Sequence, residues 1–412
     1  MISGTCEAAH NSAATWMMNV VTGSPFLISL MATAASLPFF LFTLPAGVLA
    51  DKVNRQKFVC WINLWLAATA AGLAALGWLQ LLNPCTILAS MFLVGVGFAF
   101  NAPAWISIVP QVVSDRELPS AATLSGLQLN ISGIIGPVLG GLLVPLAGAH
   151  FVFAVNAACF LLVVLAIRQW KQPIVPTKLA SESFFKSFGT ITRYVRYVPR
   201  LHVILARNFL FALFISVIPA LMPVVGLQVL HLGSSQLGLL FTSMGAGSVF
   251  GAVFVISWLR ARFSPDSVTL SANLVIVLAY VLMAFVRQAE LFFVVAALAG
   301  AGWTLSASEL WVAAQRSMPS WAQGRMNATV IMISQGAMVF GGVIWSSAAA
   351  VAGSIYTLLG AAVLFLTSLL LARRLSINVG AELEDKVSGF LSRSIESGEG
   401  TPIALPRKLF AG

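Results

Sequence analysis

The sequence predicts an all-α membrane protein in which twelve transmembrane helices form two pseudo-symmetric halves of six. Charged residues make up only 9% of the 412 residues, whereas a soluble domain carries about 25%. The mean hydropathy is +0.93. Apolar runs of roughly twenty residues, long enough to cross the hydrocarbon core as helices, recur along the chain. No soluble core would be this large and this apolar.

Each expected span is one of these apolar runs. The first run starts with the chain itself, so we expect helix 1 to be shorter at its starting end than helices 4, 7 and 10. The expected spans are residues 1–21, 27–50, 58–82, 86–109, 124–146, 151–167, 203–227, 237–259, 268–286, 291–314, 327–351 and 355–372.

The basic residues alternate from one connection to the next. A net charge of +10 is compatible with nucleic-acid binding, but the placement of the charge argues against that partner. Lysine and arginine fall at every second connection and at the C-terminal exit, and of the opposite connections only the one with Arg287 is basic. By the positive-inside rule, the basic connections and both termini lie in the cytoplasm. The lipid bilayer is therefore the expected large partner.

The chain divides into two similar halves. Thr22-Gly23-Ser24 matches Leu232-Gly233-Ser234, and Lys52 falls on Arg262 at the same offset. Phenylalanines alternate with basic residues at helical spacing near residues 184–196, which predicts an amphipathic helix on the inner leaflet or, alternatively, a regulatory partner site. We expect a six-helix bundle at 1–167, a cytoplasmic linker at 168–202, a second six-helix bundle at 203–372, and a mostly disordered cytoplasmic tail at 373–412.

Residue types with the chemistry for catalysis or metal binding are sparse. The cysteines have no metal-ligand spacing, and no Ser/His/Asp set appears in the sequence. We therefore expect no enzyme activity, no metal and no cofactor. The four cysteines are expected to serve as packing residues: Cys6, Cys60, Cys85 and Cys159.

A short basic loop follows the second span. Its pattern, Gly-x-Leu-Ala-Asp-x-x-x-Arg-x-Lys over 47–57, resembles the signature loop between helices 2 and 3 of the major facilitator superfamily. The resemblance implies the superfamily's twelve-helix fold and a conformational latch. In it, Asp51 would face the start of helix 11, where the helix dipole favours a carboxylate, with Gly47, Arg55 and Lys57 in support. The alternative is a solvated turn that only sets topology. Asn54 replaces the usual glycine, which puts the tightness of the turn in question.

The fifth span contains a second motif. Gly136-Pro137-Val138-Leu139-Gly140-Gly141 resembles the antiporter motif of drug-exporting members, with Ser125 and Ser132 at its upstream glycine positions. Proline bends a helix and glycines permit close packing. The antiporter-like residues are Gly136, Pro137, Gly140 and Gly141. The alternative is a generic packing kink.

Two acidic residues within the spans are the proton-coupling candidates. Glu7 shares a face of helix 1 with His10 and Asn11, at spacings i, i+3 and i+4. Glu309 lies in the tenth span, where a pair with Arg207 of the seventh is expected. An ionisable group inside a membrane indicates function by default. The alternatives are a hydrated end group for Glu7, a local structural pair for Glu309 and snorkelling for Arg207.

Helices 1, 4, 7 and 10 line the substrate cavity in the superfamily. Aromatic and polar residues dominate these spans, which favours a bulky, partly apolar ligand over a sugar. The cavity candidates are Asn11, Trp16, Asn101, Trp105, Arg207, Asn208, Phe211 and Trp303.

Three further stretches resemble the bacterial group that contains enterobactin exporters and related secretion-type transporters: Ser24-Pro25, Ser36-Leu37-Pro38 and Gly324-Arg325. The resemblance implies a monomeric, multi-pass protein of the bacterial inner membrane that exchanges protons for a small molecule, siderophore-like or drug-like. Many exporters carry an arginine in helix 4, and residues 86–109 contain none. A proton-coupled nutrient importer and a non-transporting receptor are the alternatives.

Overall fold

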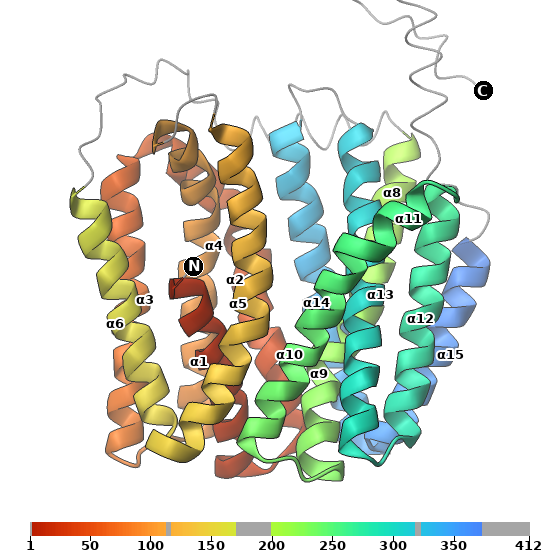
Figure 1. Ribbon diagram of the computed structural model, residues 1–412, viewed down its shortest axis with the longest axis horizontal. Coiled ribbons are helices and arrows are strands. Elements are labelled where there is room, and N and C mark those ends of the chain that lie inside the picture. The colour runs from red at the N-terminus through yellow and green to blue at the C-terminus, as the bar shows by residue number, and fades with distance from the viewer. Residues whose placement is uncertain (1, 113–116, 170–198, 318–322, 373–412) are drawn as a thin grey trace, which may run out of the picture.

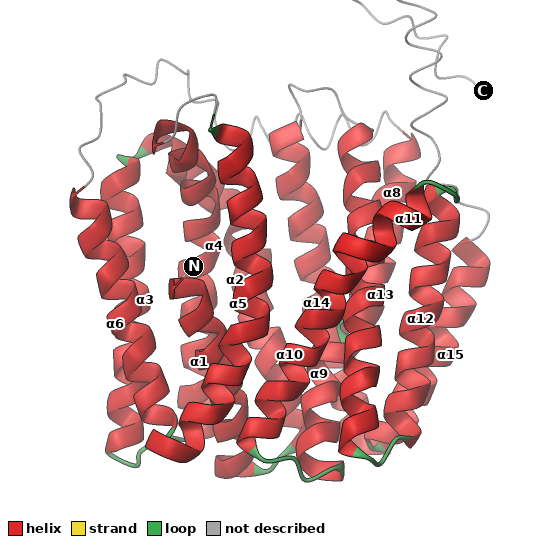
Figure 2. Cartoon of the chain, viewed as in Figure 1, coloured by secondary structure: helices red, strands yellow, loops and turns green. Residues whose placement is uncertain are grey.

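The computed structural model describes residues 2–112, 117–169, 199–317 and 323–372. The predicted amphipathic helix and the C-terminal tail lie outside these ranges. Every regular element in the described ranges is a helix (Figure 2). The predicted all-α fold of two six-helix halves is confirmed.

The first half consists of six single helices. Pro25 and Asn54 begin two of them, since proline suits the first helical turn and the Asn54 side chain accepts a hydrogen bond from the Lys57 N–H. Gly23 and Gly148 adopt positive φ between helices, a conformation in which a side chain would be strained. The helices are α1 (Ile2–Thr22), α2 (Pro25–Lys52), α3 (Arg55–Trp78), α4 (Pro84–Val112), α5 (Leu118–Ala147) and α6 (Ala149–Gln169).

The second half also has six helical rods, two of which are interrupted. The seventh consists of α8 (Pro199–Ile215), α9 (Val217–Val224) and the π-helix η1 (Val225–Val229). The eighth consists of α10 (Ser234–Phe250), the π-helix η2 (Gly251–Val255) and α11 (Ile256–Arg260). The remaining rods are α12 (Pro265–Phe285), α13 (Ala289–Arg316), α14 (Gln323–Ala352) and α15 (Ser354–Ala372).

These twelve rods correspond to the twelve predicted spans. Within the described residues, ten are long and apolar enough to cross a membrane. The other two are α1 and α5, whose described apolar stretch covers Ile131–Ala147. Helix α1 begins near mid-height of the bundle in Figure 1, and its 21 residues compare with 29 in α4 and 28 in α13. The expected shortness of helix 1 at its starting end is confirmed.

The two ends of the bundle differ. We call the lower end in Figure 1 the seam end: it carries the connections at Gly23, Gly148, Gly233 and Gly353. The opposite, linker end carries the 52–55 turn and the ends of α6 and α8 that flank residues 170–198. Between the halves, α2 packs on α14 and α9, and α5 packs on α10.

Candidate functional site

Helix α5 is packed between α1 of its own half and α10 of the other. Side chains are excluded on both sides: a Cβ on Gly136 would lie 2.6 Å from the Thr5 carbonyl oxygen on α1, and one on Gly141 would lie 2.7 Å from the Ser234 carbonyl oxygen on α10. Gly140 likewise faces α1, at Ala9. The glycines of the antiporter-like motif therefore contact two different helices: Gly136 and Gly140 contact α1, and Gly141 contacts α10.

Pro137 lies on the side of α5 that faces the second half. Proline has no N–H, so the Gly133 carbonyl lacks its helical donor. This oxygen faces Gly245 of α10, where a Cβ would lie 2.8 Å away. The Pro137 carbonyl in turn packs on Gly238. The motif thus brings the backbones of α5 and α10 together without interlocking side chains.

Ser132 occupies one upstream glycine position of the motif and has a different role. Its hydroxyl lies 3.3 Å from the Thr5 hydroxyl on α1. It therefore joins two helices of the same half and makes no contact of the kind seen between Gly141 and α10.

Few polar contacts join the halves within the described part of the chain. On the α5–α10 side, the Thr242 hydroxyl donates to the Ile134 carbonyl (2.7 Å), and the Ser235 hydroxyl donates to the Gly141 carbonyl (3.2 Å). At the seam end, the Gln228 amide donates to the Gly23 carbonyl (2.6 Å). Each such hydrogen bond contributes only about 1 kcal/mol. Within the described residues, the ion pairs Arg207–Asp266 and Arg260–Glu309 both lie inside the second half.

The α2–α14 contact also depends on glycine. Gly342 packs against Thr33 and Gly336 against the Phe40 ring, which lies 6.3 Å from the ring of Phe340. These contacts run from the seam end past mid-height. Nearer the linker end, a Cβ added to Gly47 would meet no described atom within 4 Å.

The predicted latch is only partly visible. The side chains of Asp51 and Arg55 lie outside the described set, as do those at the start of α14. Lys57 is exposed, and Asn54 caps α3 with φ −63° and ψ 111°. The turn therefore does not require glycine, which resolves the question raised by Asn54. The latch itself stays a prediction.

Glu7 faces α6 of its own half. The Asn156 amide donates to the Glu7 carboxylate (3.2 Å), and Asn11 is a second side-chain partner. Both described partners are neutral amides. Asn156 is fully buried, and its own amide oxygen has no hydrogen-bond partner.

The neighbours of Glu7 on α1 also face α6. The His10 ring is fully buried 4.7 Å from the ring of Phe153, and neither of its nitrogens has a hydrogen-bond partner. The Cys6 and Cys159 thiols meet at 2.8 Å across the same interface. The helix-1 face predicted from spacing therefore exists, and it packs inside the first half.

The predicted pair between Arg207 and Glu309 is wrong. Glu309, which is 3% exposed, accepts a hydrogen bond from Arg260 at the end of α11 (2.6 Å), and Arg207 pairs with Asp266 in the first turn of α12. Both ion pairs lie inside the second half. Arg260 follows the predicted span 237–259 and Asp266 precedes the predicted span 268–286, so both partners lie just outside the predicted spans.

The cavity candidates separate into groups. Asn208 bonds the Ser334 hydroxyl (2.6 Å) and so ties α8 to α14. Arg207 and Phe211 line a pocket inside the second half. Trp16 and Trp303 pack against the main core, Trp105 is 41% exposed, and the amide oxygens of Asn11 and Asn101 are buried without partners.

The profile of one protein family, described as transmembrane secretion effector, matches residues 1–395. This chain belongs to that family. The chain is thus a transporter of the major facilitator superfamily and not an enzyme.

The curated relatives of this chain are distant. It is 21% identical to macrolide efflux protein A of Streptococcus pyogenes over 57% of this chain and 58% of that protein. It is 25% identical to the enterobactin exporter EntS of Citrobacter koseri over 57% of this chain and 56% of that one. Each match spans little more than half of the relative's length.

Solved structures share its fold. The nucleoside transporter NupG superposes with a TM-score of 0.70 at 13% identity, covering 91% of this chain and 97% of that one. A bacterial homologue of the iron transporter ferroportin, in an inward-facing state, gives 0.68 at 15% identity, covering 90% and 96%. At these identities the likeness concerns the fold alone.

Sequence reasoning did not find Asn156, Arg260 or Asp266. Asn156 is the only strongly polar residue of the predicted span 151–167, and this isolation is the signal that identifies it in hindsight. Nothing in the sequence near Glu309 points to Arg260, which lies 49 residues away.

Proposed function

We propose that this protein is a proton-coupled exporter of a bulky, partly apolar organic molecule, siderophore-like or drug-like, that works by alternating access. The observation that carries the proposal is the contact between the halves. It is described from the seam end past mid-height, whereas near the linker end a Cβ on Gly47 would meet no described atom within 4 Å.

The chemistry of this contact suits a gate. Glycine backbones approach closely and separate again without side chains having to disengage. The three described inter-half hydrogen bonds together contribute only a few kcal/mol, about what a ligand's differential affinity supplies to shift two states. The halves can therefore separate at the seam end at moderate cost.

The proposed orientation places the linker end in the cytoplasm, with both termini there, in the bacterial inner membrane. It rests on the alternation of basic connections. The conformation described here would then be inward-facing, as the solved ferroportin homologue is. The working unit would be the monomer, with a single small molecule exchanged against protons.

Glu7 is the proposed proton carrier. Its carboxylate accepts from the Asn156 amide group, and the Asn156 carbonyl oxygen is without a partner. Rotation of that amide would let the same residue accept a hydrogen bond from the protonated acid. Glu309 has a cationic partner in Arg260, which a proton on Glu309 would leave without its counter-ion. Protonation of Glu7, unlike that of Glu309, would leave no described cationic partner without its counter-ion.

Export is proposed because the distant relatives are named for efflux of macrolides and export of enterobactin. The test is accumulation of a labelled macrolide, and separately of enterobactin, in inverted and right-side-out vesicles with an imposed pH gradient. Uptake by acid-loaded inverted vesicles, lost when the gradient is collapsed, is expected. Gradient-driven uptake only by right-side-out vesicles would instead establish an importer.

A further inference from the structure

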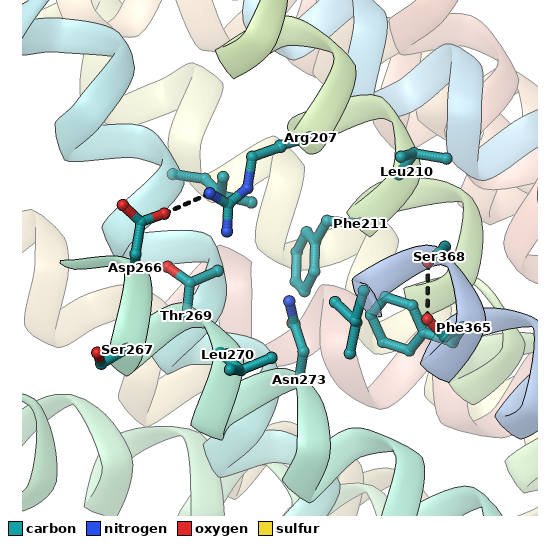
Figure 3. A pocket seen from close by; sticks show the side chains of 12 residues that line it. Arg207, Leu210, Phe211, Asp266, Ser267, Thr269, Leu270, Asn273, Phe365 and Ser368 are labelled. Atoms are coloured by element: carbon teal, nitrogen blue, oxygen red, sulfur yellow. Dashed lines mark hydrogen bonds and ion pairs between the residues drawn. The ribbon is translucent and has the colours of Figure 1, made fainter. Parts of the chain in front are cut away.

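A pocket of about 290 Å³ lies inside the second half, away from the contacts between the halves (Figure 3). Its walls come from α8, α12, α13 and α15, all helices of that half. None of the residues that join α5 to α10 or α2 to α14 lines it. The pocket is therefore separate from the path proposed for transport between the halves.

The pocket is polar at two levels and apolar between them. At one level Arg207 and Asp266 pair with each other. Asn273 lies two helical turns further along α12, about 10 Å deeper at 1.5 Å per residue. Phe211, Phe365 and four leucines line the rest. Because the arginine and the aspartate cancel, the described lining carries no net charge.

The Asn273 side chain has an unpaired amide oxygen. Asn273 is only 4% exposed, and its amide oxygen is buried without a hydrogen bond. Its amide nitrogen is directed toward Phe211 and the cavity (Figure 3). Because the amide oxygen is covered, the amide N–H group is the part of Asn273 that a ligand can reach, and an acceptor oxygen of the ligand would form a hydrogen bond with it.

The pocket's hydroxyl groups do not compete for this role. The Thr269 hydroxyl donates to the Pro265 carbonyl (2.8 Å), and the Ser368 hydroxyl donates to the Phe365 carbonyl (2.7 Å). The third hydroxyl of the lining, that of Ser267, lies 3.0 Å from the Ser264 hydroxyl. All three hydroxyls thus have a partner close by in the sequence. The Asn273 amide is the buried group of this pocket that a ligand can serve.

We propose that this pocket binds an uncharged, flat amphipathic molecule of about two fused rings that carries a hydroxyl or carbonyl oxygen. Its oxygen accepts from the Asn273 amide, and its rings lie against Phe211 and Phe365, where aromatic faces stack well. A volume of 290 Å³ is at the lower end for small-molecule sites. A phospholipid acyl chain would fill the apolar part but leave the amide unpaired. This inference does not depend on the direction or coupling of transport.

The test compares 2-naphthol with 2-methylnaphthalene, which replaces the hydroxyl by a methyl group of similar size. Binding to the purified full-length protein in detergent is measured by equilibrium dialysis. Asn273→Leu is expected to weaken naphthol about five- to tenfold, the equivalent of one hydrogen bond, and to leave methylnaphthalene within about twofold. Asn63→Leu is the matched control: Asn63 is as buried, but lies in α3 and bonds its own helix at Val59. Asn63→Leu should change the binding of neither ligand.

A second variant keeps the proposal testable if Asn273→Leu does not fold. Leu270→Trp fills the pocket and should lower naphthol binding more than tenfold, whereas Leu274→Trp, on an exposed position of the same helix, should not. Equal weakening of both ligands by Asn273→Leu would overturn the proposal. So would unchanged binding in Leu270→Trp, or displacement of naphthol by added phospholipid, which would assign the pocket to a lipid.

Discussion

The two halves share a six-helix plan but neutralise their buried acids differently. In the first half, the described partners of Glu7 are the neutral amides of Asn156 and Asn11. In the second half, Glu309 and Asp266 each pair with an arginine of the same half. The first half thus holds a carboxylate without a described counter-ion, whereas the second half keeps its charges balanced.

The continuity of the helices follows the same division. The first half consists of six single helices, while two rods of the second are interrupted by the π-helices η1 and η2. Single-turn π-helices weaken the regular hydrogen-bond ladder and often occur at functional positions. We infer that the first half supplies the titrating group and that the second supplies the side pocket and the more deformable helices.

The largest effect is expected where the halves meet. Gly238 packs on the Pro137 carbonyl and on Gly141, so Gly238→Leu should push α10 away from α5 and reduce transport at least about tenfold. The measurement is vesicle transport at matched protein levels. Gly72→Leu, on an exposed face of α3 with open space around it, is the control and should transport normally. Equal activity of the two variants would show that the contact between α5 and α10 has no part in the transport mechanism.

Glu309→Gln tests whether the second half uses its acid for structure. The change removes the counter-ion of Arg260 and should lower the thermal unfolding temperature by several degrees, because one buried partner is lost. pH-dependent transport should persist. The double variant Glu309→Gln with Arg260→Gln should recover part of the stability. A stable single variant that no longer responds to the pH gradient would reverse the roles assigned to the halves.

Asp51→Asn tests the latch predicted from the sequence. Loss of a charge–dipole contact worth about 0.3–1 kcal/mol should slow transport up to about fivefold at normal expression. Lys57→Gln, which changes an exposed charge of the same turn, provides the comparison. A wild-type transport rate in Asp51→Asn would mean that the turn only sets topology.

The smallest effect concerns the cap of α3. Asn54→Ala removes the side chain that accepts from the Lys57 N–H (3.0 Å) and should cost about 1 kcal/mol of stability. Asn54→Gly should cost only a few tenths, since glycine also serves as a cap. Thermal unfolding of both variants measures the difference, and an Asn54→Ala protein as stable as the wild type would contradict the capping role.

Much of the fold could be predicted because it depends on local sequence. Apolar length determines a spanning helix, and the runs placed all twelve rods. The π-helices were not predicted, because an extra residue in a turn leaves no periodic signal in a helix that is apolar throughout. The helix-1 face of Glu7, His10 and Asn11 was readable from spacing alone.

Partners across the bundle could not be predicted in the same way. Asn156 lies 149 residues from Glu7, and Arg260 lies 49 residues from Glu309. Which helices meet, and at what height, follows from packing that one sequence does not encode locally. Arg207 was matched with the wrong acid because two acids lie within reach of its helix in a twelve-helix bundle, and only geometry selects Asp266.

The central claim is that Glu7 carries the coupled proton. The most direct test reconstitutes wild-type, Glu7→Gln and Glu309→Gln proteins in liposomes and measures labelled macrolide in two modes, gradient-driven accumulation and gradient-free exchange. The amide of Glu7→Gln can still bond Asn156, so the fold should be kept. We predict that Glu7→Gln exchanges the labelled macrolide at the normal rate, whereas its gradient-driven accumulation falls at least about tenfold. Glu309→Gln should retain both modes. Driven accumulation by Glu7→Gln with the wild-type dependence on pH would contradict the claim.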